Sequence, residues 1–124
     1  MRPKVLLYRL GGDTETGSRL RAVLREQKIL TLTVSEAQLG ETAGRLASTN
    51  AAVSDAPPEN APEAAFMLLC GLGDRQLDRL LAAMRRAGVF VPYKAVLTEH
   101  NRNWTLCKLI EEVAREHEAL KSSQ

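Results

Sequence analysis

The stretch that decides the fold runs from Pro92 to Val113 and reads PYKAVLTEHNRNWTLCKLIEEV. It begins with a short apolar run, Ala95-Val96-Leu97, between Pro92 and a polar cluster, which is the pattern of a buried strand. After the cluster, apolar residues recur at helical spacing, as Leu106, Leu109, Ile110 and Val113. The stretch therefore predicts a strand, a polar loop and a helix in succession.

The same alternation is repeated three times upstream. Apolar and β-branched runs predict strands at residues 5–10, 29–34 and 65–70. A helix entered through Thr14–Ser18 follows the first strand. A weaker helix follows the second, from the capping-box pair Ser35 and Gln38 to about Leu46. The third helix starts after Gly71-Leu-Gly-Asp and stops at Gly88, where a left-handed residue is expected to close it.

Four strands alternating with four helices predict an α/β fold with a parallel sheet covered on both faces. The expectation is a small three-layer domain of flavodoxin-like or Rossmann-like type. The first and third strands are the most apolar, so they should be central neighbours, giving the order 2-1-3-4. A chain of 124 residues suits one domain, residues 1–124. Residues 47–63 contain three prolines and predict a long flexible loop, a linker rather than a lid.

Composition favours a soluble cytoplasmic protein. Hydrophobic residues make up 44% and charged residues 26%, and the net charge of +2 gives no bias toward nucleic acid. No apolar run is long enough to span a membrane, and the N-terminus lacks the pattern of a secretory signal. The two cysteines suit a reducing compartment better than a disulfide framework.

Ligands of parallel α/β sheets bind beyond the carboxyl ends of the strands. This rule would bring together the loops after Leu10, Cys70 and Leu97. The polar loop after Leu97 supplies the candidate ligand- or partner-binding residues Thr98, His100, Asn101 and Arg102. A small anion could meet Arg102 and the free N–H groups of the next helix there.

Structural roles explain the residues of this loop equally well. Asn103 would cap the last helix, Asn101 would make a tight turn and Trp104 would cover the edge of the core. The structural account is favoured for Asn103 and Trp104, whereas His100 and Arg102 stay open between the two.

The loop after the first strand is a candidate phosphate site formed by Thr14, Thr16, Gly17 and Ser18. It looks partly like the Thr-x-Thr-Gly-x-Thr phosphate loop of flavodoxins, which implies flavin mononucleotide as the cofactor. Arg19 stands in place of the last threonine, and an aromatic content of 4% leaves few rings to enclose a flavin. The alternative is an ordinary turn with hydroxyl caps.

The sequence indicates neither a catalytic constellation nor a metal site. Cys107 lies in the first turn of the last helix, where the helix dipole could lower its thiol pKa and His100 could act as a base. A small core residue is the better interpretation of both Cys107 and Cys70. His117 is ten positions beyond Cys107, or about 15 Å along a helix, so the two cannot share one metal ion.

The part of the chain from Phe66 to about Leu120 resembles a bacterial domain-of-unknown-function family of Firmicutes type. The likeness is carried by five segments: Met67-Leu-Leu-Cys-Gly-Leu, Asp74 with Leu77-Asp-Arg-Leu-Leu, Ala87-Gly-Val, Pro92-Tyr-Lys-Ala-Val-Leu-Thr and Asn101-Arg-Asn-Trp-Thr. The resemblance implies a small α/β protein without an assigned activity. It therefore supplies no catalytic residues.

These observations favour a non-catalytic binding or regulatory module that uses the strand-end surface to bind an unidentified protein or a small anionic ligand. The alternative is a protein that binds flavin or a nucleotide phosphate through Thr14–Ser18. A third hypothesis is a homodimer whose assembly is its function.

Overall fold

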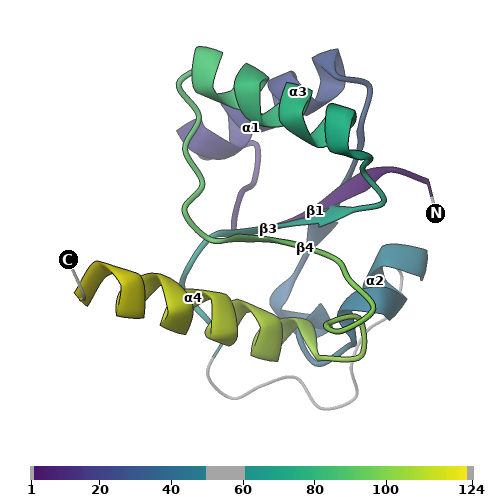
Figure 1. Ribbon diagram of the computed structural model, residues 1–124, viewed down its shortest axis with the longest axis vertical. Coiled ribbons are helices and arrows are strands. Elements are labelled where there is room, and N and C mark those ends of the chain that lie inside the picture. The colour runs from purple at the N-terminus through teal and green to yellow at the C-terminus, as the bar shows by residue number, and fades with distance from the viewer. Residues whose placement is uncertain (1, 50–60, 123–124) are drawn as a thin grey trace.

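The computed structural model describes residues 2–49 and 61–122 (Figure 1). It has four strands: β1 (Lys4–Tyr8), β2 (Leu30–Val34), β3 (Phe66–Cys70) and β4 (Lys94–Val96). It has four α-helices: α1 (Glu15–Glu26), α2 (Ala43–Thr49), α3 (Asp74–Arg86) and α4 (Leu106–Ser122). A short 3-10 helix, η1 (Glu36–Gln38), lies between β2 and α2. The predicted alternation of strands and helices is confirmed.

The strand order β2-β1-β3-β4 is also confirmed, but the prediction of an all-parallel sheet is wrong. β1 runs parallel to β2 and β3 parallel to β4, whereas β1 and β3 are antiparallel. Alternation fixes the direction within each β-α-β unit, because its crossover helix returns the chain to the starting end of the sheet. The long connection between α2 and β3 can enter the sheet from either end. The sheet is therefore mixed.

The antiparallel pairing makes the two halves of the chain equivalent by an approximate two-fold rotation. Leu6 lies opposite Leu68, Lys4 opposite Cys70 and Tyr8 opposite Phe66. Each residue of β1 thus has its equivalent 62 positions later in β3 (68 − 6 = 62), and the axis passes between Leu6 and Leu68. Each half contributes strand, helix, strand and helix in the same order.

The two-fold relation extends to the starts of α2 and α4. Thr42 and Thr105, 63 positions apart (105 − 42 = 63), form an isolated antiparallel bridge. Around it, equivalent backbone bonds occur in pairs: Ala43 N–H donates to the Trp104 carbonyl and Leu106 N–H to the Glu41 carbonyl, both at 2.9 Å. This clasp, the bridge between Thr42 and Thr105 with the backbone bonds around it, joins the two halves a second time, away from the sheet.

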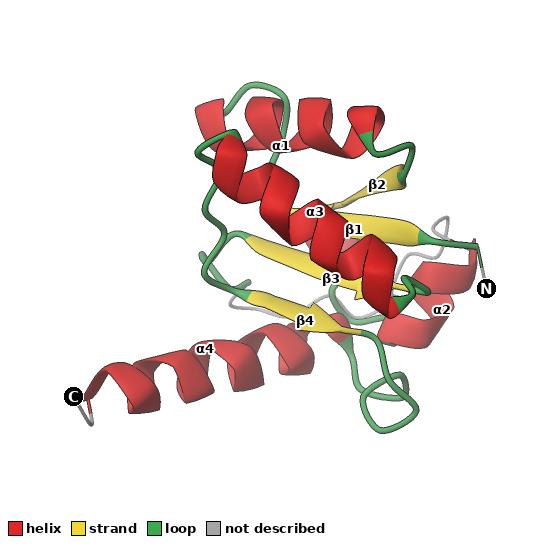
Figure 2. Cartoon of the chain, turned by 45° about the horizontal axis from the view of Figure 1, so that its top comes forward, coloured by secondary structure: helices red, strands yellow, loops and turns green. Residues whose placement is uncertain are grey.

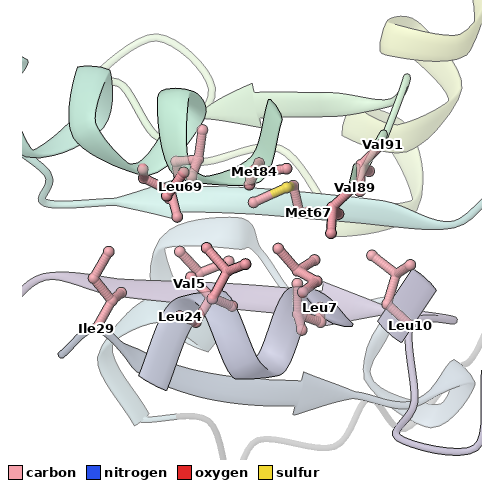
Figure 3. Packing of buried hydrophobic residues seen from close by; sticks show 14 residues of the cluster. Val5, Leu7, Leu10, Leu24, Ile29, Met67, Leu69, Met84, Val89 and Val91 are labelled. Carbon is pink, nitrogen blue, oxygen red and sulfur yellow. The ribbon is translucent and has the colours of Figure 1, made fainter. Parts of the chain in front are cut away.

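Helices cover both faces of the sheet. Figures 1 and 2 show α1 and α3 on one face and α2 and α4 on the other. Alternate residues of β1 and β3 point to opposite faces, as the pleat requires. Val5, Leu7, Met67 and Leu69 pack with Leu24, Met84 and their neighbours under α1 and α3 (Figure 3). The second cluster, under α2 and α4, contains Leu6, Tyr8, Phe66, Leu68, Leu46 and Leu109.

Three predicted boundaries differ from the structure. The capping box of Ser35 and Gln38 is present, but it opens only η1, and α2 begins later at Ala43. Because α2 continues to Thr49, the predicted loop cannot begin at residue 47. Residues 50–60 of that loop lie outside the described part of the chain. The last helix begins at Leu106 and is capped by the Thr105 hydroxyl, which accepts from Lys108 N–H at 3.1 Å, so the prediction of Asn103 as cap is wrong.

The ends of α1 and α3 provide a test of their backbone conformations. Both helices end at a left-handed residue, Lys28 (φ 58°) after α1 and Gly88 (φ 71°) after α3. Replacing Lys28 with glycine should stabilise the protein by about 0.5–1 kcal/mol, because lysine is strained in this region. Gly88→Ala should destabilise it by a similar amount, since a Cβ at Gly88 meets no atom closer than 3.8 Å and only the backbone strain is added.

Urea unfolding of both variants checks this prediction. Equal signs for the two substitutions would contradict it.

Candidate functional site

The antiparallel pairing divides the surface that was expected to form one site. The carboxyl end of β1 lies beside the start of β3, because Tyr8 pairs with Phe66. The loop after β1 is therefore at one end of the sheet, and the loops after β3 and β4 are at the other. The prediction that all three loops meet is wrong, since it depended on parallel strands. Gly71 and the loop after β4 do come together.

A cleft of about 310 Å³ lies where β3 and β4 end, lined by Gly71, Leu97, Thr98, Glu99 and Arg102. Two of the predicted binding residues, Thr98 and Arg102, line it. The Arg102 guanidinium lies 3.3 Å from the Glu99 carboxylate. The side chain of Glu99 is 92% exposed, so this ion pair is solvated and contributes little to stability. The charged groups of the cleft can therefore exchange partners at small cost.

Asn101 holds the shape of this loop. Its side-chain oxygen accepts a hydrogen bond from Thr98 N–H at 2.8 Å, and its amide nitrogen donates to the Val96 carbonyl at 3.0 Å. The Thr98 hydroxyl in turn accepts from Asn101 N–H at 3.1 Å. Asn101 is one of the few buried polar residues of the described chain, with 9% of its surface exposed. Its side chain thus positions Thr98.

His100 lies beside Trp104 rather than in the cleft. The two rings make an edge-to-face contact with centroids 5.2 Å apart. On the same indole, the Lys108 ammonium lies 4.8 Å from the ring centroid. His100 is exposed and is absent from the residues that line the cleft.

The corresponding place in the first half is filled by an arginine. Arg9 follows β1 as Gly71 follows β3, and both are left-handed, with φ of 56° and 72°. The Arg9 guanidinium lies 2.8 Å from the Glu36 carboxylate and donates through Nε to the Tyr8 hydroxyl at 3.0 Å. The hydrogen bond to Tyr8 raises the pKa of Arg9, so the guanidinium stays charged.

Our sequence reasoning missed this equivalence, although a signal was present. Ser-Glu-x-Gln begins at Ser35, and Thr-Glu-x-Asn begins 63 positions later at Thr98. Thr-x-x-Arg-Leu begins at Thr42, and Thr-x-x-Lys-Leu begins 63 positions later at Thr105. The repeat is short and chemically conservative, which makes it easy to overlook.

The candidate phosphate loop lies at the opposite end of the sheet and is largely engaged in capping α1. The Thr14 hydroxyl accepts from Gly17 N–H at 3.0 Å and donates to the Gly11 carbonyl at 2.8 Å. Gly17 is buried, and a Cβ there would lie 2.1 Å from the Gly11 carbonyl oxygen, so the glycine serves close packing. Ser18 N–H donates to the Thr14 carbonyl within the helix. Thr16 remains beside a second hollow, of about 230 Å³.

Neither cysteine has the properties of an activated thiol. Burial raises the pKa of Cys70 to about 12. Burial, with a hydrogen bond to Glu111 and its negative charge, raises the pKa of Cys107 to about 11. The suggestion that the helix start lowers the Cys107 pKa is therefore wrong. Within residues 2–49 and 61–122, no three His, Cys, Asp or Glu side chains gather to hold a metal ion.

The fold and the cleft define a small α/β protein with an internally two-fold mixed sheet. Residues 65–120 match the family described as a domain of unknown function (DUF3783), which confirms the resemblance seen from Phe66 to Leu120. The matched segment spans β3, α3, β4 and most of α4, and so corresponds to one of the two equivalent halves. Comparison with curated proteins and with solved structures gave no match.

In the described part of the chain, no helix is both long and apolar enough to cross a membrane.

Removing the Asn101 side chain should loosen the cleft. Asn101→Ala leaves the Thr98 N–H and the Val96 carbonyl without their partners, so we expect a loss of about 1–3 kcal/mol of unfolding free energy. Amide exchange at Thr98 should also accelerate. His100→Ala, one position away on an exposed site, removes the edge-to-face contact with Trp104 but no buried hydrogen bond, so it should cost less and leave amide exchange at Thr98 unchanged. Equal effects of the two substitutions would show that Asn101 does not organise the loop.

The raised pKa of Cys107 predicts slow alkylation. With a pKa of about 11 in place of 9.0, the thiolate fraction at neutral pH falls, roughly a hundredfold. Iodoacetamide should label Cys107 slowly at pH 7.5, and the rate should climb until the pH passes about 11. Mass spectrometry of the labelled site gives the alkylation rate of Cys107. The rate for free glutathione under the same conditions is the reference. Labelling as fast as glutathione at pH 7.5 would contradict it.

Proposed function

We propose that this chain is a non-catalytic binding or regulatory module whose site is the cleft between Gly71 and the loop Thr98–Arg102. The observation that carries the proposal is that three residues with polar side chains, Thr98, Glu99 and Arg102, line one cleft together with Gly71. Gly71 has no side chain to occupy this space. A partner protein or a small charged ligand, such as an anion on Arg102, is the occupant that such groups suit.

The internal bonds of the loop support a binding role. Asn101 fixes the Thr98 backbone from a buried position, so the site needs little ordering when a ligand arrives. The pair of Glu99 and Arg102 is solvated and makes one contact at 3.3 Å. A ligand that offers a better-placed opposite charge can replace that contact. The backbone of the site is thus held in place, whereas its charged side chains can change ion-pair partners.

The thiol chemistry favours binding over catalysis. At neutral pH the raised pKa values keep Cys70 and Cys107 protonated, so neither supplies a nucleophilic thiolate. Both are free thiols, which suits the reducing cytoplasm that we propose as the location. Homodimerisation stays a further proposal. Among the residues that the structure describes, Phe90 is the most exposed large apolar side chain, at 74%, and it could contribute to such an interface.

Substitution of Arg102 tests the proposal. We expect Arg102→Gln to weaken binding of a captured partner or of inorganic phosphate about three- to tenfold, because one charge-assisted contact is lost. Nitrogen-15 NMR titration with phosphate provides the measurement, with Thr98 and Gly71 amides as reporters. Arg115→Gln, which removes an exposed arginine of α4 that also pairs with a glutamate, is the matched control.

If neither phosphate nor any captured partner responds to Arg102→Gln, the proposed site is refuted. If Arg115→Gln has the same effect, the response reflects net charge alone and also argues against the site.

The alternative function is binding of a flavin or nucleotide phosphate at the other end of the sheet. The observation in its favour is the second hollow, where Thr14, Thr16 and Arg9 lie with the exposed Phe90. A phosphate would have to compete with Glu36 for the Arg9 guanidinium, and the ring could stack on a base or flavin. An absorbance spectrum and a native mass of freshly purified protein decide between the two. A flavin band or a nucleotide mass lost in Thr16→Val would favour the alternative.

A further inference from the structure

We infer that the cleft beside Gly71 binds a guanidinium group, in the place that Arg9 fills within the first half of the chain. This inference rests on the proposed function, because it uses the same cleft, and it assigns the ligand a cationic group on Glu99 in place of an anion on Arg102. It follows from comparing the two equivalent halves position by position.

The first half provides the template. After β1, Arg9 adopts a left-handed backbone and directs its guanidinium to Glu36, with Nη2 and Oε1 at 2.8 Å. Its Nε donates to the Tyr8 hydroxyl and to the Pro62 carbonyl, both at 3.0 Å. The guanidinium thus contacts three oxygen acceptors from three parts of the chain. This end of the first half is closed by its own arginine.

The second half has the same loop and glutamate without the arginine, and Cys70 stands where the first half has Tyr8 (70 − 62 = 8). Gly71 takes the position of Arg9 with the same left-handed backbone, and Glu99 takes the position of Glu36, 63 residues later (99 − 36 = 63). The loop around each glutamate is built alike: the side-chain oxygen of Gln38 accepts from Ser35 N–H at 2.9 Å, as that of Asn101 accepts from Thr98 N–H at 2.8 Å. The cleft therefore occupies the place where an arginine side chain would lie.

The groups that line the cleft suit a planar cation. The exposed carboxylate of Glu99 can accept two parallel N–H bonds from a guanidinium, a geometry that an ammonium cannot match. Thr98 and Leu97 line the same cleft. Arg102 makes a single 3.3 Å contact to Glu99 Oε1, and a guanidinium that bonds both carboxylate oxygens displaces it.

A substitution that fills the cleft from within gives the sharpest test. In Gly71→Arg, the new side chain should pair with Glu99 as Arg9 pairs with Glu36, and so occupy the cleft. Gly71→Ala is the matched control, because it adds the same left-handed strain without a guanidinium. Well-dispersed spectra of both variants establish that each is folded.

The probe is methylguanidinium, followed by nitrogen-15 NMR at constant ionic strength. We expect it to shift the amides of Gly71, Thr98 and Glu99, and to bind about three- to fivefold more tightly than methylammonium. The shifts should persist in Gly71→Ala, weaken at least about threefold in Glu99→Gln and vanish in Gly71→Arg. Comparing free arginine with a blocked arginine residue then shows whether the guanidinium belongs to an amino acid or to a polypeptide.

Two results would overturn the inference: no response at Gly71 and Thr98, or equal shifts in Gly71→Arg and Gly71→Ala. The proposed function is refuted by a different set of results. If phosphate moves Thr98 and Arg102 resonances while methylguanidinium does not, the cleft remains a binding site and only the guanidinium assignment falls. If neither probe moves them and Arg102→Gln alters no captured partner, both fall.

Discussion

The antiparallel pairing of β1 with β3 is the constraint on which the rest of the structure depends. It sets Leu6 opposite Leu68 and makes the two halves equivalent about that point. Because both strands are buried on both faces, the pairing is held by two core clusters at once. It also decides which loops share an end of the sheet. If β3 ran parallel to β1, Gly71 would lie at the same end of the sheet as the loop after β1. In the structure it lies at the other end.

The equivalence of the halves gives a physical meaning to their differences. Where side chains serve the fold, the two halves agree: Gln38 and Asn101 both fix a loop, and Thr42 and Thr105 form the clasp. Where they differ, one half is closed and the other open, with Arg9 at one position and Gly71 at the other. Arg9 brings a guanidinium to Glu36, whereas Gly71 brings no charged group to Glu99.

Much of the fold could be predicted from the sequence, because hydrophobic periodicity marks each strand and helix and the most apolar strands mark the centre. The direction of β3 could not, since nothing local to Phe66–Cys70 tells which end of the sheet the chain enters. Thr98 and Arg102 were found from their place after a strand, and they line the cleft. Glu99 and Gly71 also line the cleft, but their correspondence to Glu36 and Arg9 follows only from the internal repeat.

Cross-strand Hα–Hα nuclear Overhauser contacts between β1 and β3 test the central claim most directly. Antiparallel strands bring Hα atoms together at alternate opposed pairs. The account predicts contacts in which residue numbers rise in one strand as they fall in the other, from the series Lys4 with Cys70, Leu6 with Leu68 and Tyr8 with Phe66, or from the pairs between them. Contacts in which the residue numbers rise together in both strands, such as Lys4 near Phe66 and Tyr8 near Cys70, would contradict the two-fold arrangement and the cleft derived from it.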